Sequence, residues 1–203
     1  MKQTEIGSFI KVFVLIIFAF SSLDIFSQKV VINTTAGNIE LELYGDKAPV
    51  TVANFLQYVK DKVYDGGSFY RVVRPDNQKP DQPHIEVIQG GIDSDSLKRR
   101  GPIELERTSV TGLKHLDGTI SMARSTPNSA TSEFFICINP QPPLDFGGKR
   151  NPDGQGFAAF GKVTKGMKVV KKIQKQKAIL YPALGLNQRL EKSVKILKIS
   201  IIE

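Results

Sequence analysis

The 203-residue sequence contains one cysteine, two histidines and no tryptophan. Because Cys137 has no cysteine partner in the chain, an intramolecular disulfide is excluded, and its apolar neighbours predict a buried thiol. No group of cysteines and histidines has the spacing of a zinc site, so we predict neither a metal nor a cofactor. His84 and His115 lie outside any motif that activates a nucleophile, such as Gly-x-Ser-x-Gly. We expect both side chains to be solvated, which argues against a Ser-His-Asp hydrolase.

The N-terminal apolar run is too short to cross a bilayer. Residues 12–20 are continuously apolar, whereas a transmembrane helix needs about 20 such residues. Lys2 gives a positive start before this run, and Ser27 offers a small residue for cleavage. We therefore interpret residues 1–27 as a signal peptide and residues 28–203 as one domain. This interpretation predicts an exported protein, periplasmic or secreted, that is membrane-associated if the segment is not cleaved.

Acidic residues are in the minority, with 20 Asp and Glu against 28 Lys and Arg, which gives a net charge of +8. Much of the excess lies between residues 162 and 177, where the lysines predict the solvated side of a helix. Because basic patches attract polyanions, a basic interaction protein is one alternative. The sequence has no RNA-binding motif and no interleaving of aromatic and basic residues. We therefore predict no nucleic-acid partner, and we expect a monomer.

Residues 118–139 are the most informative stretch of the chain. Residues 119–123 alternate, residues 125–132 are rich in turn formers, and residues 134–138 form a short apolar run with aromatic and β-branched side chains. In a strand, Glu133, Phe135 and Cys137 share one face, and Phe134 takes the other. A core needs only one of these faces. The second face must therefore be covered by other parts of the protein or form the floor of a pocket.

The rest of the chain predicts a mainly β domain with two helices. Alternation over residues 29–44 indicates a hairpin, and helical spacing after Pro49 brings Val52, Phe55, Leu56 and Val59 to one face. Residues 166–177 predict a second helix, and residues 194–202 predict a final strand. The pattern by itself leaves both a sandwich and a barrel open.

The stretch 118–139 resembles the cyclophilin family of peptidyl-prolyl cis-trans isomerases, which has a Ser-Met-Ala, a Pro-Asn loop and a Phe-Phe-Ile-Cys strand in the same order. Residues 67–73, 87–91 and 159–163 are similar to the family's Phe-His-Arg, Gln-Gly-Gly and Phe-Gly-Lys-Val segments. The resemblance runs from Val30 to the C-terminus and indicates a bacterial-type, exported member. It implies a closed eight-stranded antiparallel barrel with a helix over each open end.

The resemblance also implies the roles of individual residues. Arg71 would be the donor to the prolyl nitrogen, Gln89 would orient Arg71 or hold substrate backbone, and Phe135 would supply the pocket ring. Each has a structural alternative, respectively an ion pair, a strand-end cap and plain core. The substrate-binding residues implied in the same way are Val87, Met122, Ala123, Arg124, Glu133, Leu144 and Phe157.

Several positions depart from the family pattern. Glu86 stands where the family has a pocket aromatic, Glu133 replaces a glutamine, and Tyr70 replaces the histidine before the arginine. Pro143 replaces a tryptophan, and Phe157 aligns with the pocket histidine. These changes leave the arginine, glutamine and phenylalanine in place. Glu86 and Glu133 could pair with Arg71 and either orient it or neutralise it.

The function predicted from these residues is acceleration of X-Pro bond rotation in proline-containing polypeptides, which would assist the folding of exported proteins. The alternative is a proline-peptide binding or chaperone module with little turnover, suggested by Glu86 in place of a pocket aromatic. Residues 75–84 and 141–156 predict long surface loops. Whether these loops gate the pocket or add a partner surface stays open at this point.

Overall fold

The structure is a computed structural model that describes residues 28–92 and 100–202. The predicted signal peptide, residues 1–27, lies outside the described residues. Within the described ranges, no helix combines the length and the apolar character that crossing a membrane requires.

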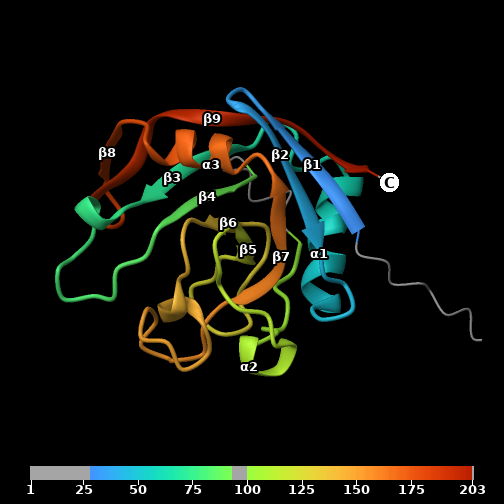
Figure 1. The fold of residues 1–203 in the computed structure, drawn as a ribbon, viewed down its shortest axis with the longest axis horizontal. Helices are drawn as coiled ribbons and strands as arrows, with labels where there is room; N and C mark the ends of the chain where they lie inside the picture. Colours follow the sequence, from blue (N-terminus) through green and yellow to red (C-terminus); the bar gives the residue numbers. More distant parts are fainter. Residues whose placement is uncertain (1–27, 93–99, 203) are drawn as a thin grey trace, which may run out of the picture.

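Eight antiparallel strands close into a barrel (Figure 1). The ring runs in the order β1, β2, β7, β5, β6, β4, β3 and β9, and pairing of β1 with β9 closes it. A further strand, β8, pairs with β9 outside the ring. The strands are β1 (Gln28–Thr34), β2 (Gly37–Leu43), β3 (Ser68–Val73), β4 (Val87–Gly91), β5 (Thr119–Met122), β6 (Phe134–Cys137), β7 (Ala158–Lys165), β8 (Ala178–Tyr181) and β9 (Leu186–Ile202). The mainly β, closed eight-stranded barrel expected from the sequence is thus confirmed.

Two of the three α-helices within the described residues correspond to those that the sequence predicts. Helix α1 (Pro49–Lys60) begins at its proline and buries Val52, Phe55, Leu56 and Val59, as their spacing indicates. Helix α3 (Met167–Gln174) buries Val170 and Ile173. The third, α2 (Thr108–Thr111), is a single turn that the sequence pattern does not reveal. Two 3-10 turns, η1 (Pro75–Asn77) and η3 (Pro142–Leu144), lie in the two long loops.

The β1–β2 hairpin and helix α3 meet at one end of the barrel. Gly37 has a φ of 132°, and a Cβ at this position would come within 2.9 Å of the Val169 side chain. Gly166 has a φ of 98° and packs its Cα against the Asn38 carbonyl, which a Cβ would approach to 2.4 Å. These two glycines therefore allow the helix to lie directly on the hairpin.

The last strand is longer than predicted. It begins at Leu186 rather than near Val194, and β8 folds back on its first part as a hairpin (Figure 1). The alternation that marks residues 194–202 continues through Gln188 and Leu190, which are both buried. A polar residue at a buried position masks this alternation in the sequence.

The barrel interior is built from aromatic rings. Phe134 is fully buried and meets Phe55, Tyr64 and Phe69 edge-on, with ring centroids 5.5–5.7 Å apart. Edge-to-face contacts of this kind are favourable beyond the area that they bury. Phe134, Ile136 and Ile138 share one face, as strand parity predicts, and this face belongs to the main core.

The opposite face of β6 contributes to a second, smaller cluster outside the barrel. Phe135 and Cys137 pack there with residues from β3, β4 and the loop before β7. The Cys137 thiol is buried, as expected, and burial raises its pKa. The remaining members of the cluster are Val73, Ile85, Val87, Leu144 and Phe157.

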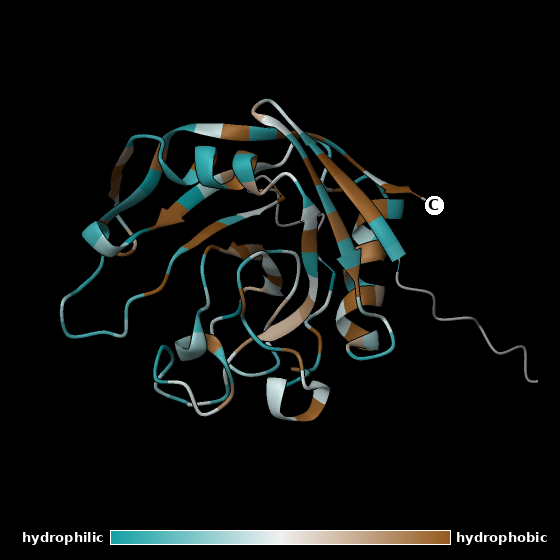
Figure 2. Cartoon of the chain, viewed as in Figure 1, coloured by the Kyte–Doolittle hydropathy of each residue, from teal (hydrophilic) through white to brown (hydrophobic). Residues whose placement is uncertain are grey.

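In Figure 2, helix α3 contains many hydrophilic residues, and strands such as β1 and β2 alternate between hydrophilic and hydrophobic positions. Lys168, Lys171, Lys172 and Lys175 are all exposed on α3 or at its end. The lysine-rich segment is therefore a solvated helix face, as its spacing predicts.

Candidate active site

The proposed catalytic residues lie in one row across neighbouring strands on the outside of the barrel. Arg71 on β3 pairs with Gln89 on β4, Gln89 pairs with Phe135 on β6, and Phe135 pairs with Ser121 on β5. Residues paired directly in antiparallel strands point to the same face. Strand register thus assembles side chains that lie up to 64 positions apart in the sequence.

A cavity of about 250 Å³ opens over this row. It brings together eight of the residues singled out in the sequence. These are Arg71, Val87, Gln89, Ala123, Arg124, Phe135, Leu144 and Phe157, and Ile85, Arg150 and Asn151 complete the lining. Glu133 lines a neighbouring cavity of about 250 Å³ that shares Gln89, Ala123 and Arg124 with the first.

Met122 lies elsewhere than its predicted place in the substrate-binding wall. Its side chain is buried in the main core and does not line the cavity. The reason is strand parity, because Ser121 takes the outer face next to Phe135 and its neighbour Met122 must point inward.

Phe135 forms the floor of the cavity. Its ring is 5% exposed and meets the Phe157 ring edge-on at 5.3 Å between centroids. On another side it stacks against His115, with centroids 6.0 Å apart and planes inclined by 16°. The ring is therefore held from two directions while part of it faces the cavity.

Arg71 is held by the amide groups of two glutamines. Its Nη1 donates to Gln89 Oε1 at 2.7 Å, and its Nε and Nη2 donate to Gln188 Oε1 at 3.0 and 2.6 Å. Burial is the main cause that lowers the pKa of the Arg71 guanidinium. Because both partners are neutral amides, the guanidinium is oriented without being neutralised.

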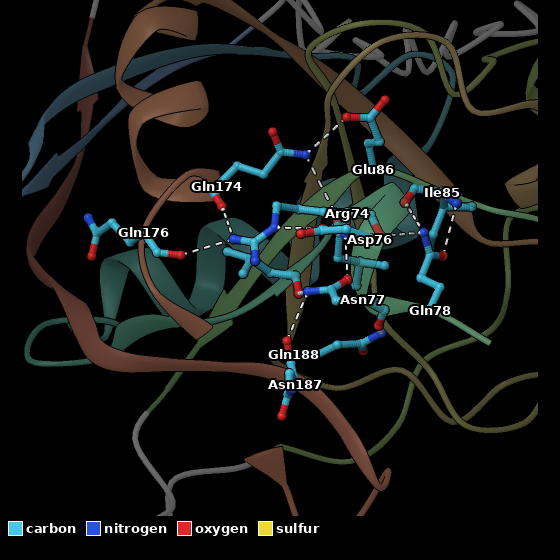
Figure 3. A network of polar contacts seen from close by, with 12 residues as sticks. Arg74, Asp76, Asn77, Gln78, Ile85, Glu86, Gln174, Gln176, Asn187 and Gln188 are labelled. Carbon is cyan, nitrogen blue, oxygen red and sulfur yellow. Dashed lines mark hydrogen bonds and ion pairs between the residues drawn. The ribbon is translucent and has the colours of Figure 1, made fainter. Parts of the chain in front are cut away.

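Gln188 is a site residue that the sequence reasoning missed. It is fully buried and comes from the β8–β9 hairpin, and its own Nε2 donates to the Asn77 carbonyl at 2.8 Å (Figure 3). Arg71 and Gln188 are 117 residues apart in the chain. Since the predicted final strand covers only residues 194–202, the sequence pattern does not place Gln188 beside Arg71.

Tyr70 separates Glu133 from Gln89 and Arg71. The Tyr70 hydroxyl donates to Glu133 Oε2 at 2.6 Å and accepts from Gln89 Nε2 at 2.8 Å. Burial, reinforced by the Glu133 charge, raises the pKa of Tyr70 far above its usual range, so the phenol stays neutral. The influence of Glu133 on Arg71 thus passes through two neutral side chains, which orient the guanidinium.

Glu86 does not enter the cavity. Its carboxylate accepts hydrogen bonds from Asn139 Nδ2 at 3.0 Å and from Gln174 Nε2 at 3.2 Å, on the side of helix α3 (Figure 3). Val87 and Gln89 share the cavity face of the strand, so Glu86 falls on the other face. The replacement of a pocket aromatic by Glu86 therefore leaves no carboxylate in the cavity.

Arg124 forms a fixed wall between the two cavities. Its Nη1 and Nη2 donate to the two oxygens of Asp153 at 2.7 and 2.9 Å, and its Nε donates to the Gly156 carbonyl at 2.7 Å. The guanidinium also lies 5.1 Å from the centre of the Phe157 ring. The hydrogen bonds from Arg124 lower the pKa of Asp153 to about 2.

His115 is buried, contrary to the expectation that both histidines are solvated, whereas His84 is exposed as expected. The Nδ1 of His115 lies 2.7 Å from Asp145 Oδ1, and its Nε2 lies 3.0 Å from Ser121 Oγ. Burial tends to raise the pKa of Asp145, but the hydrogen bonds from His115 outweigh it and lower that pKa.

This serine, histidine and aspartate cannot act as a hydrolase triad. Ser121 is 0% exposed and His115 is 1% exposed, so a substrate bond cannot reach the hydroxyl. The His115 ring instead supports Phe135 from behind. His115 and Asp145 are 30 residues apart, so no local pattern indicates their contact.

The chain matches proteins of one family throughout the described domain. The sequence profile of the cyclophilin type peptidyl-prolyl cis-trans isomerase/CLD family matches residues 29–201. Peptidyl-prolyl cis-trans isomerase A of Dickeya dadantii is 43% identical over 148 residues, which cover 72% of this chain and 71% of that protein. A peptidyl-prolyl cis-trans isomerase of Acinetobacter baylyi is 37% identical over 170 residues, 83% of this chain and 82% of that protein.

A solved structure supports the same assignment at the level of the fold. The cyclophilin type peptidyl-prolyl cis-trans isomerase of Cryptosporidium parvum has a TM-score of 0.68 to this structure at 21% sequence identity. The match covers 88% of this chain and 99% of that chain. With the barrel, the strand row and these matches together, the chain belongs to the cyclophilin-type peptidyl-prolyl cis-trans isomerases.

Proposed function

We propose that this protein accelerates rotation about X-Pro bonds in exported polypeptides, with Arg71 as the catalytic donor, Gln89 as its partner and Phe135 as the floor of the proline pocket. The observation that carries the proposal is a guanidinium held by neutral amides at the edge of an aromatic-floored cavity. The clients are extended or unfolded segments that contain proline.

The chemistry of X-Pro rotation matches what such a site offers. The bond has partial double-bond character, and its rotation has a barrier of roughly 20 kcal/mol. Rotation weakens the resonance and makes the prolyl nitrogen more pyramidal, so that it can accept a hydrogen bond. A donor that contacts the nitrogen only in the twisted state lowers the barrier, and each 1.4 kcal/mol gained there is worth about tenfold in rate.

Arg71 has N–H groups that its hydrogen bonds to Gln89 and Gln188 do not use. An arginine side chain carries five N–H donors, and three hydrogen bonds orient this one on Gln89 and Gln188. Each of the two terminal nitrogens therefore keeps one N–H for a substrate atom. A preorganised, charged donor of this kind needs no rearrangement as the substrate twists.

Gln89 is fixed in one orientation by its two neighbours. Its oxygen accepts from Arg71, so its Nε2 must face Tyr70, to which it donates. The adjoining walls from Val87, Leu144 and Phe157 are apolar and suit a proline ring. The Ala123 N–H donates to the Glu133 carbonyl at 2.8 Å, which fixes the backbone beside the cavity, where the backbone of Ala123 and Arg124 would bind an extended peptide.

The role in export rests on the N-terminal sequence. The positive start, the apolar run over residues 12–20 and the small residue Ser27 favour secretion through a membrane and cleavage near residue 27. N-terminal sequencing of the protein recovered from the cell exterior or periplasm tests this part. A mature chain that begins near Gln28 is expected, and protein confined to the cytoplasm with Met1 intact would contradict it.

The alternative of a binding module with little turnover was suggested by Glu86. Since the Glu86 carboxylate binds Asn139 and Gln174 on the side of α3, the presence of Glu86 no longer favours the binding module.

Catalysis is tested by measuring the cis-trans exchange of a short X-Pro peptide with the full chain and with Arg71→Ala. Loss of a preorganised donor is expected to reduce the catalysed rate on the order of 10²-fold. Equal binding by both proteins without faster exchange in either would favour the binding module.

A further inference from the structure

The two long loops predicted near the pocket meet through Arg150. This residue lies in the loop before β7, and its Nη1 donates to Gln78 Oε1 at 3.0 Å and to the Pro83 carbonyl at 2.9 Å. Gln78 is itself held, because its Nε2 donates to the carbonyls of Arg74 and Ile85 (Figure 3). The loops therefore hold the Arg150 guanidinium at the wall of the cavity.

The lining of the cavity has a surplus of positive charge. It contains Arg71, Arg124 and Arg150, but neither an aspartate nor a glutamate among the residues that the structure describes. Asp153 compensates the charge of Arg124 through a bidentate ion pair. Arg71 and Arg150 are hydrogen-bonded only to amide and carbonyl oxygens within the described ranges. Two positive charges thus share one cavity without a carboxylate partner there.

The guanidiniums of Arg71 and Arg150 repel each other across the cavity. Burial lowers the pKa of Arg150, and for Arg71 the effect of burial is increased by the nearby charge of Arg150. A bound anion would relieve the repulsion between the two guanidiniums. Among the described residues, the Nε and Nη2 groups of Arg150 have no hydrogen-bond acceptor, so these two nitrogens of its planar fork are suited to bind a carboxylate.

We propose that Arg150 selects clients with an acidic residue next to the proline, because its guanidinium can bind that carboxylate while the proline ring occupies the cavity over Phe135. The inference rests on the proposed isomerase function and adds the class of substrate to it. An acidic side chain suits Arg150 better than a backbone carbonyl does, since only the carboxylate compensates the surplus charge.

The preference is expected on one side of the proline only. The neighbouring cavity shares Gln89 and Arg124 with the first but is not lined by Arg150, and its charged lining residues, Arg124 and Glu133, have opposite signs. A client carboxylate placed there would lie away from Arg150, whereas one beside Arg150 would meet an opposite charge. Two peptide series, with the acidic residue directly before or directly after the proline, therefore separate the two sides.

The experiment compares the full chain with two variants. Arg150→Gln removes the proposed contact, and Lys149→Gln removes the same charge from the exposed neighbouring residue, which does not line the cavity. Each protein is given matched peptides with Glu or Gln at the tested position, and the readout is the Glu-to-Gln ratio of kcat/KM within that protein. A ratio of about three- to tenfold is expected in one series for the wild type. It should fall to about one in Arg150→Gln, persist in Lys149→Gln and shrink as salt is raised.

Two results would overturn the proposal. One is a Glu-to-Gln ratio near one in both series for the wild type. The other is a ratio that survives in Arg150→Gln, even if that variant handles both peptides less well, which would reduce Arg150 to a structural link between the loops. Peptide binding followed by NMR titration gives the same ratio without turnover. If no peptide is isomerised, the proposed function fails, while this binding ratio still decides for or against Arg150.

Discussion

At the scale of single residues, the neutrality of the groups around Arg71 governs the site. A carboxylate in direct contact would compensate the guanidinium charge and compete with the substrate for its N–H groups. Gln89 and Gln188 orient the guanidinium nitrogens of Arg71 without compensating its charge. Glu133 is connected to Arg71 through the side chains of Tyr70 and Gln89 in this hydrogen-bond chain. Glu86 lies on the other face of its strand and binds Asn139.

Gln188→Glu tests this directly. The new carboxylate would lie against Nε and Nη2 of Arg71, where the amide oxygen now accepts at 3.0 and 2.6 Å, and would form an ion pair. We predict a fall in kcat of about tenfold or more, with a much smaller change in peptide affinity. Asn187→Asp is the matched control, since it adds the same charge at the exposed neighbouring position. A Gln188→Glu enzyme with wild-type kcat would show that compensation of Arg71 is harmless.

At the scale of elements, side-chain hydrogen bonds fix the loop between β6 and β7 at several residues. Arg124 binds Asp153 and Gly156, Asp145 binds His115, and Arg150 reaches across to Gln78 and Pro83. Leu144 and Phe157, which line the cavity, are joined by a backbone hydrogen bond of 3.0 Å. The loop is thus a structured wall of the site rather than a loose insertion.

Asp153→Asn should loosen this wall in a pH-dependent way. The folded-state pKa of Asp153, about 2, lies below the usual 3.8, so its ion pair stabilises the protein above about pH 4 and is lost as the pH falls toward 2. The variant should therefore lose less stability than the wild type between pH 4 and pH 2, and its KM at neutral pH should rise by about threefold. Urea unfolding across this pH range, with Asp46→Asn as an exposed control, measures the first effect. Parallel pH curves for wild type and Asp153→Asn would contradict the assignment.

At the scale of the whole molecule, the two faces of strand β6 have different roles: one face stabilises the barrel core, and the other forms part of the proposed site. Phe134 points into the barrel and Phe135 points out to the cavity, so neighbouring residues serve different clusters. The core holds the barrel closed, and the barrel holds the outer row of side chains in register.

Phe134→Ala and Phe135→Ala should therefore have different effects. Removing the fully buried Phe134 ring should cost about 3–5 kcal/mol of unfolding free energy, because the surrounding rings cannot close the cavity. Removing Phe135 should cost less stability and should reduce catalysis more strongly in the protein that remains folded. Denaturant unfolding and peptide exchange measured on both variants test this. Equal losses of stability and activity in the two variants would contradict the separation.

Local sequence patterns predict most strands and helices, whereas the closed barrel is predicted from the family resemblance. Alternation and helical spacing locate most elements, and family motifs supply the order in which they close. Parity correctly separates Phe134 from Phe135, and the family resemblance assigns Phe135 to the pocket side. Parity also separates Met122 from Ser121, and the structure places Met122 in the core.

The parts that the sequence does not reveal depend on contacts between distant segments. Gln188 reaches Arg71 across 117 residues, His115 meets Asp145 across 30, and Arg150 meets Gln78 across 72. A polar residue buried by a distant partner looks like an exposed one in the sequence. This is why His115 is predicted to be solvated. Glu86, in contrast, is assigned to the pocket by its alignment with a family aromatic, and its contacts with Asn139 and Gln174 place it elsewhere.

The most direct test of the account is the catalysed cis-trans exchange rate of an X-Pro peptide with wild type, Arg71→Ala and Arg71→Lys, measured together with peptide affinity. The lysine keeps the positive charge but lacks the planar set of donors that Gln89 and Gln188 orient. We predict that both variants lose on the order of 10²-fold in rate while binding the peptide within about threefold of the wild type. Wild-type exchange by Arg71→Ala would contradict the central claim, and full activity in Arg71→Lys would show that charge alone, without donor geometry, is sufficient.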